Sequence, residues 1–157
     1  MNTASDELFE QQEDTQRGRY LTFNLGEEVY GIEIGYVTEI IGMHPITKVP
    51  EVKDYIKGII NLRGKIIPVI DMRLKFRKKP IEYDDRTCII VIDADDMTMG
   101  LIVDKVSEVM SIDGESMAPP PRHMTGIKNK YLQGIGKVGS DVILLLDCKK
   151  LFDEGEE

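Results

Sequence analysis

The amino-acid sequence predicts an all-β fold made of two small barrels of about five strands each, with short helices between some strands. Short apolar runs rich in Ile and Val recur at regular intervals along the 157 residues, separated by turn residues such as Gly and Asp. Helical periodicity is confined to short stretches. The chain also contains one unit twice, which favours two related subdomains over one large sheet.

The duplication emerges when the sequence is aligned with itself. A shift of 76 positions places residues 131–152 on residues 55–76, with Tyr, Gly, Ile, Asp and Phe at matched positions. A shift of 69 places residues 100–109 on residues 31–40. We assign the seven extra residues of the second copy to residues 117–130, where prolines and a glycine interrupt any regular pattern.

The first copy is expected to begin with a hairpin. Residues 20–25 and 29–34 contain alternating and β-branched side chains on either side of Gly26. In residues 35–41 the apolar side chains recur at helical intervals, which predicts a short helix or helical turn that ends at Gly42. The prolines in the following segment are typical of a sheet edge.

A second hairpin is predicted from residues 59–62 and 65–70. The turn between them is Arg63-Gly64, in which glycine supplies a positive φ and arginine places a cation at the tip. Residues 66–70 are apolar on both faces of the predicted strand, so the second face needs a cover. The other subdomain could supply it, or a partner protein, and both could do so at different ends of the strand.

The second copy repeats this plan. One helical turn at residues 72–76 is expected to end the first copy. The elements predicted for the second copy are a hairpin of residues 87–93 and 97–103, a segment at residues 104–112, a closing hairpin of residues 132–138 and 141–146, and a short helix at residues 149–152.

Composition sets limits on the class of protein. Residues 1–18 are polar and acidic and are predicted to be a disordered tail; residues 19–152 form the folded part, and residues 153–157 an acidic tail. The net charge of −8 argues against a nucleic-acid partner. No signal sequence or apolar run of about 18 residues is present, so we expect a cytoplasmic protein without direct membrane insertion. Cys88 and Cys148 are predicted to be buried, reduced thiols.

No motif points to catalysis. Residues 134–139 match the dinucleotide string G-x-G-x-x-G, but a strand follows instead of the required helix. His44 and His123 lack metal-ligand spacing to any cysteine or carboxylate. Residues 93–96 resemble the start of a calcium loop but lack its later glycine and glutamate. We therefore expect neither an enzyme nor a cofactor or metal site.

Glu39 and Arg63 are the charged residues of greatest interest. Each belongs to an otherwise apolar surface of its predicted element. An exposed ion pair contributes less than about 1 kcal/mol to stability, whereas charges beside an apolar groove give a partner register and selectivity. The simpler alternative, two unrelated solvated charges, stays open at this point.

Residues 58–64 read Gly-Ile-Ile-Asn-Leu-Arg-Gly, and residues 66–71 read Ile-Ile-Pro-Val-Ile-Asp. This sequence resembles the signature of the CheW family of chemotaxis coupling proteins, and the likeness covers residues 20–152. The resemblance implies two five-stranded barrels like those of Src-homology-3 (SH3) domains, packed about a pseudo-twofold axis. It also implies a non-enzymatic adaptor that joins the cytoplasmic tips of methyl-accepting chemoreceptors to the regulatory domain of the CheA histidine kinase in membrane receptor arrays.

The resemblance also implies which residues contact each partner. Those expected in a receptor-facing groove between the barrels are Ile34, Val37, Glu39, Ile40, Arg63, Gly64, Val106 and Val109. Ile46 and Ile66 are expected to face the kinase. The proline-rich residues 118–123 could contact a neighbour in a receptor array or serve as a passive linker. The alternative is an acidic barrel like the oligonucleotide-binding (OB) fold, with another ligand; the charge and the lack of aromatic stacking residues count against nucleic acid.

Overall fold

The structure, a computed structural model, describes residues 18–121 and 130–152. The expected disordered and acidic tails, apart from Gly18, and part of the proline-rich segment lie outside the described residues. The elements of the first copy are β1 (Arg19–Leu25), β2 (Glu28–Glu33), the 3₁₀ helix η1 (Ile34–Tyr36), β3 (Val37–Gly42), β4 (Ile56–Leu62), β5 (Lys65–Asp71) and α2 (Met72–Lys75). Those of the second are β6 (Cys88–Ala94), β7 (Met97–Val103), β8 (Lys105–Ser111), η2 (Gly114–Ser116), β9 (Met117–Ala118), β10 (Leu132–Val138), β11 (Asp141–Leu146) and α3 (Cys148–Leu151).

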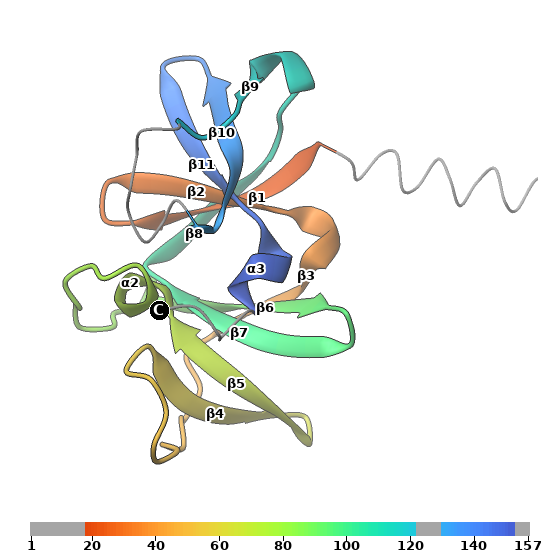
Figure 1. Cartoon of the computed structure of the whole chain (residues 1–157). Coiled ribbons are helices and arrows are strands. Elements are labelled where there is room, and N and C mark those ends of the chain that lie inside the picture. Colours follow the sequence, from red (N-terminus) through yellow and green to blue (C-terminus); the bar gives the residue numbers. More distant parts are fainter. Residues whose placement is uncertain (1–17, 122–129, 153–157) are drawn as a thin grey trace, which may run out of the picture.

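The strands form two sheets, and each sheet contains strands of both copies (Figure 1). Sheet A has the order β8-β1-β2-β11-β10-β9, and sheet B has the order β3-β6-β7-β5-β4. The two sequence shifts relate each strand of sheet A except β9 to a strand of sheet B. The related pairs are β8 with β3, β1 with β6, β2 with β7, β11 with β5, and β10 with β4. Even the parallel pairs correspond, since β2 lies beside β11 as β7 lies beside β5. This is the order that a pseudo-twofold relation between the copies requires.

The predicted all-β class is confirmed, but the sheets are open, and sheet A has six strands. In sheet B only an isolated bridge, Thr47 to Ile59, links the segment after β3 to β4. In sheet A the two-residue strand β9 pairs with β10 in the corresponding place. Prolines flank both short pairings and lack the N–H donor that a longer ladder needs, which explains why neither barrel closes through continuous strands.

The short helix or helical turn predicted for residues 35–41 is wrong from Val37 onward. Only the 3₁₀ turn η1 is present, and β3 begins at Val37, with alternating half-buried and exposed side chains. Four of the six residues of β3 are β-branched and favour a strand. A bulge opposite β6, between Val37 and Glu39, interrupts the pairing register. The predicted helical turns after β5 and β11 are confirmed as α2 and α3.

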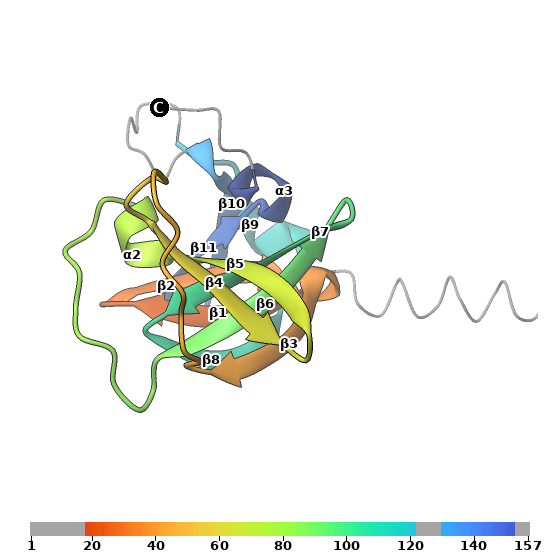
Figure 2. The same cartoon turned by 90° about the horizontal axis from the view of Figure 1, so that it is seen from below.

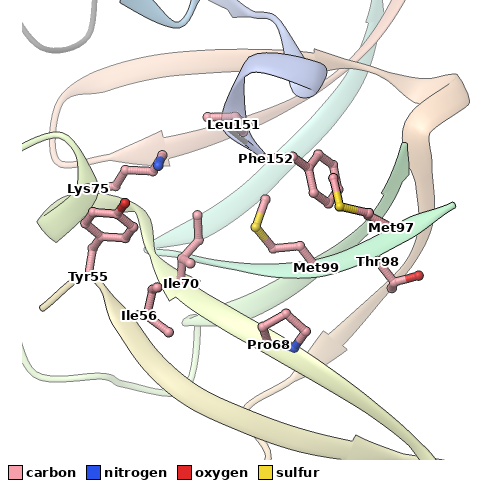
Figure 3. A pocket seen from close by; sticks show the side chains of 10 residues that line it. All are labelled: Tyr55, Ile56, Pro68, Ile70, Lys75, Met97, Thr98, Met99, Leu151 and Phe152. Atoms are coloured by element: carbon pink, nitrogen blue, oxygen red, sulfur yellow. The ribbon is translucent and has the colours of Figure 1, made fainter. Parts of the chain in front are cut away.

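A shared core joins the two sheets. It contains a row of aromatic rings, in which Phe23 stacks on Tyr30 at 5.6 Å between centroids, Tyr30 lies 5.4 Å from Phe76, and Phe76 lies 5.7 Å from Tyr131. Smaller cores fill the inner face of each sheet. The shared core is less complete beside Phe152, where a cavity of about 270 Å³ remains (Figure 3).

The repeated Tyr and Asp of the sequence have a structural role. The backbone N–H of Asp71 donates to the carbonyl of Tyr55 at 2.8 Å, and Asp147 donates to Tyr131 at 2.8 Å. Each aspartate then caps the short helix that follows it, with side-chain oxygens accepting from backbone N–H groups of that helix. Tyr83 adds a hydrogen bond from its hydroxyl to Asp71, at 2.7 Å.

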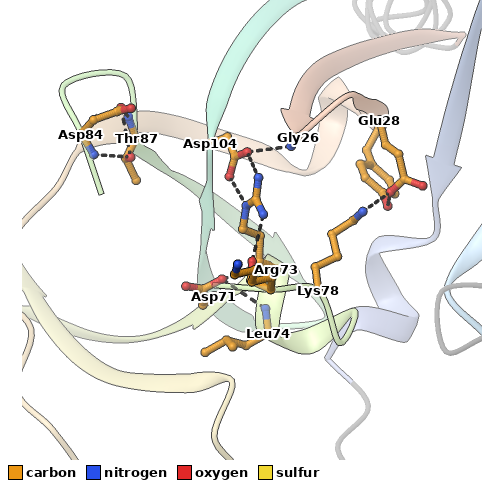
Figure 4. Close-up of polar contacts among 11 residues, drawn as sticks. Gly26, Glu28, Asp71, Arg73, Leu74, Lys78, Asp84, Thr87 and Asp104 are labelled. Carbon is orange, nitrogen blue, oxygen red and sulfur yellow. Dashed lines mark hydrogen bonds and ion pairs between the residues drawn. The ribbon is translucent and has the colours of Figure 1, made fainter. Parts of the chain in front are cut away.

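Arg73 of α2 connects the two sheets through Asp104, which lies between β7 and β8 (Figure 4). Its Nε and Nη2 donate to the two carboxylate oxygens at 2.8 and 2.7 Å, a bidentate pair. The Gly26 N–H, from the β1–β2 turn, donates to the same carboxylate at 2.7 Å. Burial alone would raise the pKa of Asp104, but these hydrogen bonds and the charges of Arg73 and Lys78 lower it below its ordinary value.

This lowered pKa predicts an acid-dependent stability. The folded state holds the ionised Asp104 more tightly than the unfolded state does, so the contribution is complete above the unfolded pKa of about 3.9 and is lost as the pH falls through the folded pKa. Asp104→Asn should lower the free energy of unfolding at pH 7 by about 1–3 kcal/mol and flatten its decline in acid, measured by urea denaturation. An unchanged acid profile in this variant would contradict the assignment.

Gly58 predicts a second stability effect. It has φ of 145°, and a Cβ there would lie 2.1 Å from the Thr47 carbonyl oxygen, at the bridge that links β4 to the segment after β3. Gly58→Val should destabilise the protein by about 2–4 kcal/mol in urea denaturation. Gly139→Ala is the control, because Gly139 also has positive φ but open space around it, and about 1 kcal/mol is expected. Equal losses of unfolding free energy in the two variants would show that the close approach of Gly58 to the Thr47 carbonyl is unimportant.

Candidate functional site

The β4–β5 turn has a geometry that explains its sequence. Arg63 and Gly64 both have positive φ, of 53° and 85°, as in the turns that match the twist of a tight hairpin. The Asn61 side chain accepts a hydrogen bond from the Gly64 N–H at 2.8 Å. Glycine was expected to carry the positive φ alone, and the left-handed conformation of Arg63 was not predicted.

Arg63 forms an ion pair with Glu39. The two residues are 24 positions apart, so the sequence alone does not reveal this contact. Glu39 lies on β3 at one edge of sheet B, and Arg63 extends from the hairpin that forms the other edge. The pair is solvent-accessible, with 69% of the Arg63 side chain and 31% of the Glu39 side chain exposed. It borders a hollow of about 320 Å³ with both polar and apolar walls, lined by Thr38, Glu39, Leu62, Arg63, Lys65, Ile67, Val91, Asp93 and Thr98.

The apolar residues of the predicted receptor groove fall into two groups. Ile34, Val37 and Val106 are half-buried and pack against the shared core. Ile40 and Val109 are 45% and 40% exposed and occupy equivalent positions of the repeat.

The two exposed residues lie on β3 and β8, an edge strand of each sheet. These strands run along the same border of the molecule in Figure 2. The two sheets therefore present related apolar side chains at their edges.

The two predicted kinase-facing residues have different environments. Ile66 on β5 is 57% exposed, whereas Ile46 is half-buried against the core of sheet B. Along β5, Pro68 is also exposed, but Ile70 is buried in the shared core. The other subdomain therefore covers one end of this apolar strand and leaves the other end uncovered.

Several exposed apolar residues lie outside the predicted contact sets, among them Val142 and Met97. Val142 on β11 is 54% exposed and occupies the repeat position of Ile66. The shift of 76 positions that was already visible in the sequence could have identified it. Met97, 48% exposed at the start of β7, has no such signal, because its repeat counterpart is Glu28.

The metal-ligand, thiol and glycine-rich features considered in the sequence have the following environments in the described residues. Within residues 18–121 and 130–152, no group of three or more His, Cys, Asp or Glu side chains is placed to hold a metal ion. Burial raises the pKa of the Cys148 thiol to about 12, and it also raises the pKa of Cys88, so both thiols are poor nucleophiles. The glycine-rich string near residue 134 lies in the β10–β11 hairpin, as its context predicted.

Comparison with known proteins identifies the family. The model of the CheW-like domain matches residues 19–156. The chain belongs to the CheW family. It is 38% identical over 143 residues to the chemotaxis protein CheW of Klebsiella aerogenes, covering 91% of this chain and 86% of that protein. It is 34% identical over 140 residues to the chemotaxis protein CheW of Treponema pallidum, covering 87% and 82%.

A solved CheW structure has the same fold. The crystal structure of the scaffolding protein TtCheW from Thermoanaerobacter tengcongensis matches with a TM-score of 0.81 and 38% identity, covering 89% of this chain and 96% of that chain. The resemblance drawn from residues 58–71 is therefore confirmed. None of the helices in the described part of the CheW-like domain has the length and apolar character needed to cross a membrane.

Proposed function

We propose that this chain is a non-enzymatic scaffold of bacterial chemotaxis, which couples the cytoplasmic tips of methyl-accepting chemoreceptors to the CheA histidine kinase. Its membership of the CheW family supports a role in chemotaxis, and TtCheW is described as a scaffolding protein. The observation that carries the proposal is the presence of exposed apolar residues, Ile40, Val109 and Ile66, on strands β3, β8 and β5. Such residues suit protein contacts and offer no chemistry.

In this proposal the receptor binds along β3 and β8. A helical receptor tip would place apolar side chains against Ile40 and Val109, with the half-buried Ile34, Val37 and Val106 beneath them. The Glu39–Arg63 pair and the Gly64 turn would lie beside this contact. Fixed opposite charges at the rim favour one register of the bound helix and reject partners with unmatched charges.

The kinase regulatory domain would bind the outer face of the β4–β5 hairpin. Ile66 and Pro68 are exposed there, and Ile46 supports the hairpin from its inner side. Because the two partners use different surfaces, one chain can hold both and raise their effective local concentration. The chain would then work in the cytoplasm and reach the membrane through the receptors.

The receptor contact predicts a selective loss of binding. Ile40→Glu and Arg63→Ala should each weaken capture of a purified receptor-tip fragment about tenfold or more while changing the unfolding free energy by about 1 kcal/mol or less, since both side chains are exposed. Val37 is a poorer probe, because it packs on the core. The measurement is a pull-down titration with Ile66→Glu as the matched control. Receptor binding equal to that of the parent would remove these residues from the contact.

The kinase contact predicts the reverse selectivity. A carboxylate at Ile66 would have to be desolvated in the complex, so Ile66→Glu should weaken binding of the CheA regulatory domain about tenfold or more and leave receptor capture intact. Isothermal titration calorimetry with the purified domain measures this effect. Ile40→Glu serves as the control here. Unaltered kinase binding, with the variant folded, would refute the assignment of Ile66.

A further inference from the structure

The cavity beside Phe152 has no assigned role. It has a volume of about 270 Å³ and lies between sheet B and α3 (Figure 3). Its lining is largely apolar and comprises Tyr55, Ile56, Pro68, Ile70, Lys75, Met97, Thr98, Met99, Leu151 and Phe152. This volume is slightly below the range of drug-sized sites, which begins at roughly 300 Å³, and it suits one ring.

The repeat shows what is missing from this cavity. In the other copy the equivalent position of Met99 is Tyr30, which is fully buried between Phe23 and Phe76. The equivalents of Phe23 and Phe76 on the cavity side are Ile92 and Phe152.

One aromatic row of the core is therefore complete, and its counterpart lacks two rings. The cavity occupies the part of the fold where the other copy places the Tyr30 ring.

The cavity walls favour an aromatic occupant. The sulfur atoms of Met97 and Met99 can contact the edge of a ring, and the Phe152 ring can pack against it. Phe152 is half-buried here, whereas its equivalent Phe76 is buried, so part of Phe152 is accessible. The Lys75 ammonium lies 4.3 Å from the Tyr55 ring centroid, which shows that this side already accommodates aromatic faces.

The position of the cavity favours a side chain from another protein. Its rim includes Met97 and Pro68, which are exposed, and Ile66 lies two residues before Pro68 on the same face of β5. The main chain of a partner could therefore rest on an apolar surface while one of its side chains enters the cavity. Buried aromatic anchors of this kind dominate the affinity of many interfaces.

We propose that this cavity receives one aromatic side chain, preferentially phenylalanine, from a partner protein. Phenylalanine is preferred because Met97 stands at the repeat position of Glu28, the carboxylate that accepts the hydroxyl hydrogen bond of Tyr30 at 2.6 Å. A tyrosine hydroxyl in this cavity would lack that acceptor. The apolar surface beside the cavity, with Ile66 and Pro68, is the one proposed above for the kinase regulatory domain, so the identity of the partner rests on that proposal. The ring site itself is tested with short peptides, and its failure is therefore distinguishable from a failure of the kinase assignment.

The test uses the full chain labelled with ¹³C at the methionine methyl groups. The probes are acetyl-Gly-Phe-Gly-amide, the same peptide with Leu or Tyr in place of Phe, and p-cresol. We expect the Phe peptide to shift the Met97 and Met99 methyl signals at a concentration several-fold lower than the Leu peptide requires. Equal effects of Phe and Leu, or none at millimolar concentration, would overturn the proposal. Binding of p-cresol without binding of the Phe peptide would indicate a free aromatic molecule and would overturn it as well.

Variants locate the binding site. Met99→Tyr should fill the cavity as Tyr30 does and abolish binding, whereas Met99→Leu should keep it. Met97→Glu, at an exposed position, should retain the fold and shift the preference from the Phe to the Tyr peptide several-fold. Unchanged probe binding in either Met99→Tyr or Met97→Glu would refute the site. Phe9→Ala tests whether the ring that fills the cavity comes from this chain itself. Altered Met99 signals in that variant without any probe would show that it does, and would overturn the proposal of a partner protein.

Discussion

The exchange of strands between the two copies of the repeat is the constraint on which the structure depends. β1 and β2 of the first copy complete the sheet of the second, while β6 and β7 of the second complete the sheet of the first. Neither copy alone contains the strands of one sheet, so both must fold together. The shared core and the Arg73–Asp104 contact hold this arrangement at its centre, where the aromatic row joins residues of both copies. Sheet edges are consequently placed symmetrically on the outside, where the apolar residues of β3 and β8 occur.

Much of this fold was predictable because the signals were local. The β10–β11 hairpin has the boundaries expected from alternation and from its glycines, and Asp71 and Asp147 mark the starts of the two short helices as the repeat suggested. β3 was mistaken for a helix because Val37, Ile40 and Ile41 have helical spacing and a bulge disturbs the strand alternation. Pairing with β6, which is distant in sequence, decides its conformation, and no local pattern encodes that partner.

The candidate surfaces were predictable to different degrees. Glu39 and Arg63 were predicted as site residues because they are charged residues on apolar surfaces. The structure shows that their ion pair joins the two edges of sheet B. A strand that is apolar on both faces suggests that some of its side chains, such as Ile66, are exposed. Only the fold shows that the other subdomain covers Ile70 but leaves Pro68 and Ile66 exposed. The cavity beside Phe152 could not be predicted, because it arises from the difference between Tyr30 and Met99 in the context of a shared core. A substitution within a repeat becomes a cavity only where the surrounding packing cannot adjust.

Divergence between the copies also explains why the charged site exists on one sheet. Glu39 and Glu108 are equivalent in the repeat, but the position of Arg63 is taken by Gly139 in the second copy. Both positions have positive φ, 53° at Arg63 and 61° at Gly139. Glycine adopts this conformation freely, whereas a residue with a Cβ is disfavoured by about 1–2 kcal/mol. The exposed pair with Glu39 returns less than about 1 kcal/mol, so stability does not account for an arginine at this turn. The contact with a receptor proposed for the guanidinium would account for it, and it would distinguish the β4–β5 hairpin from its otherwise equivalent counterpart.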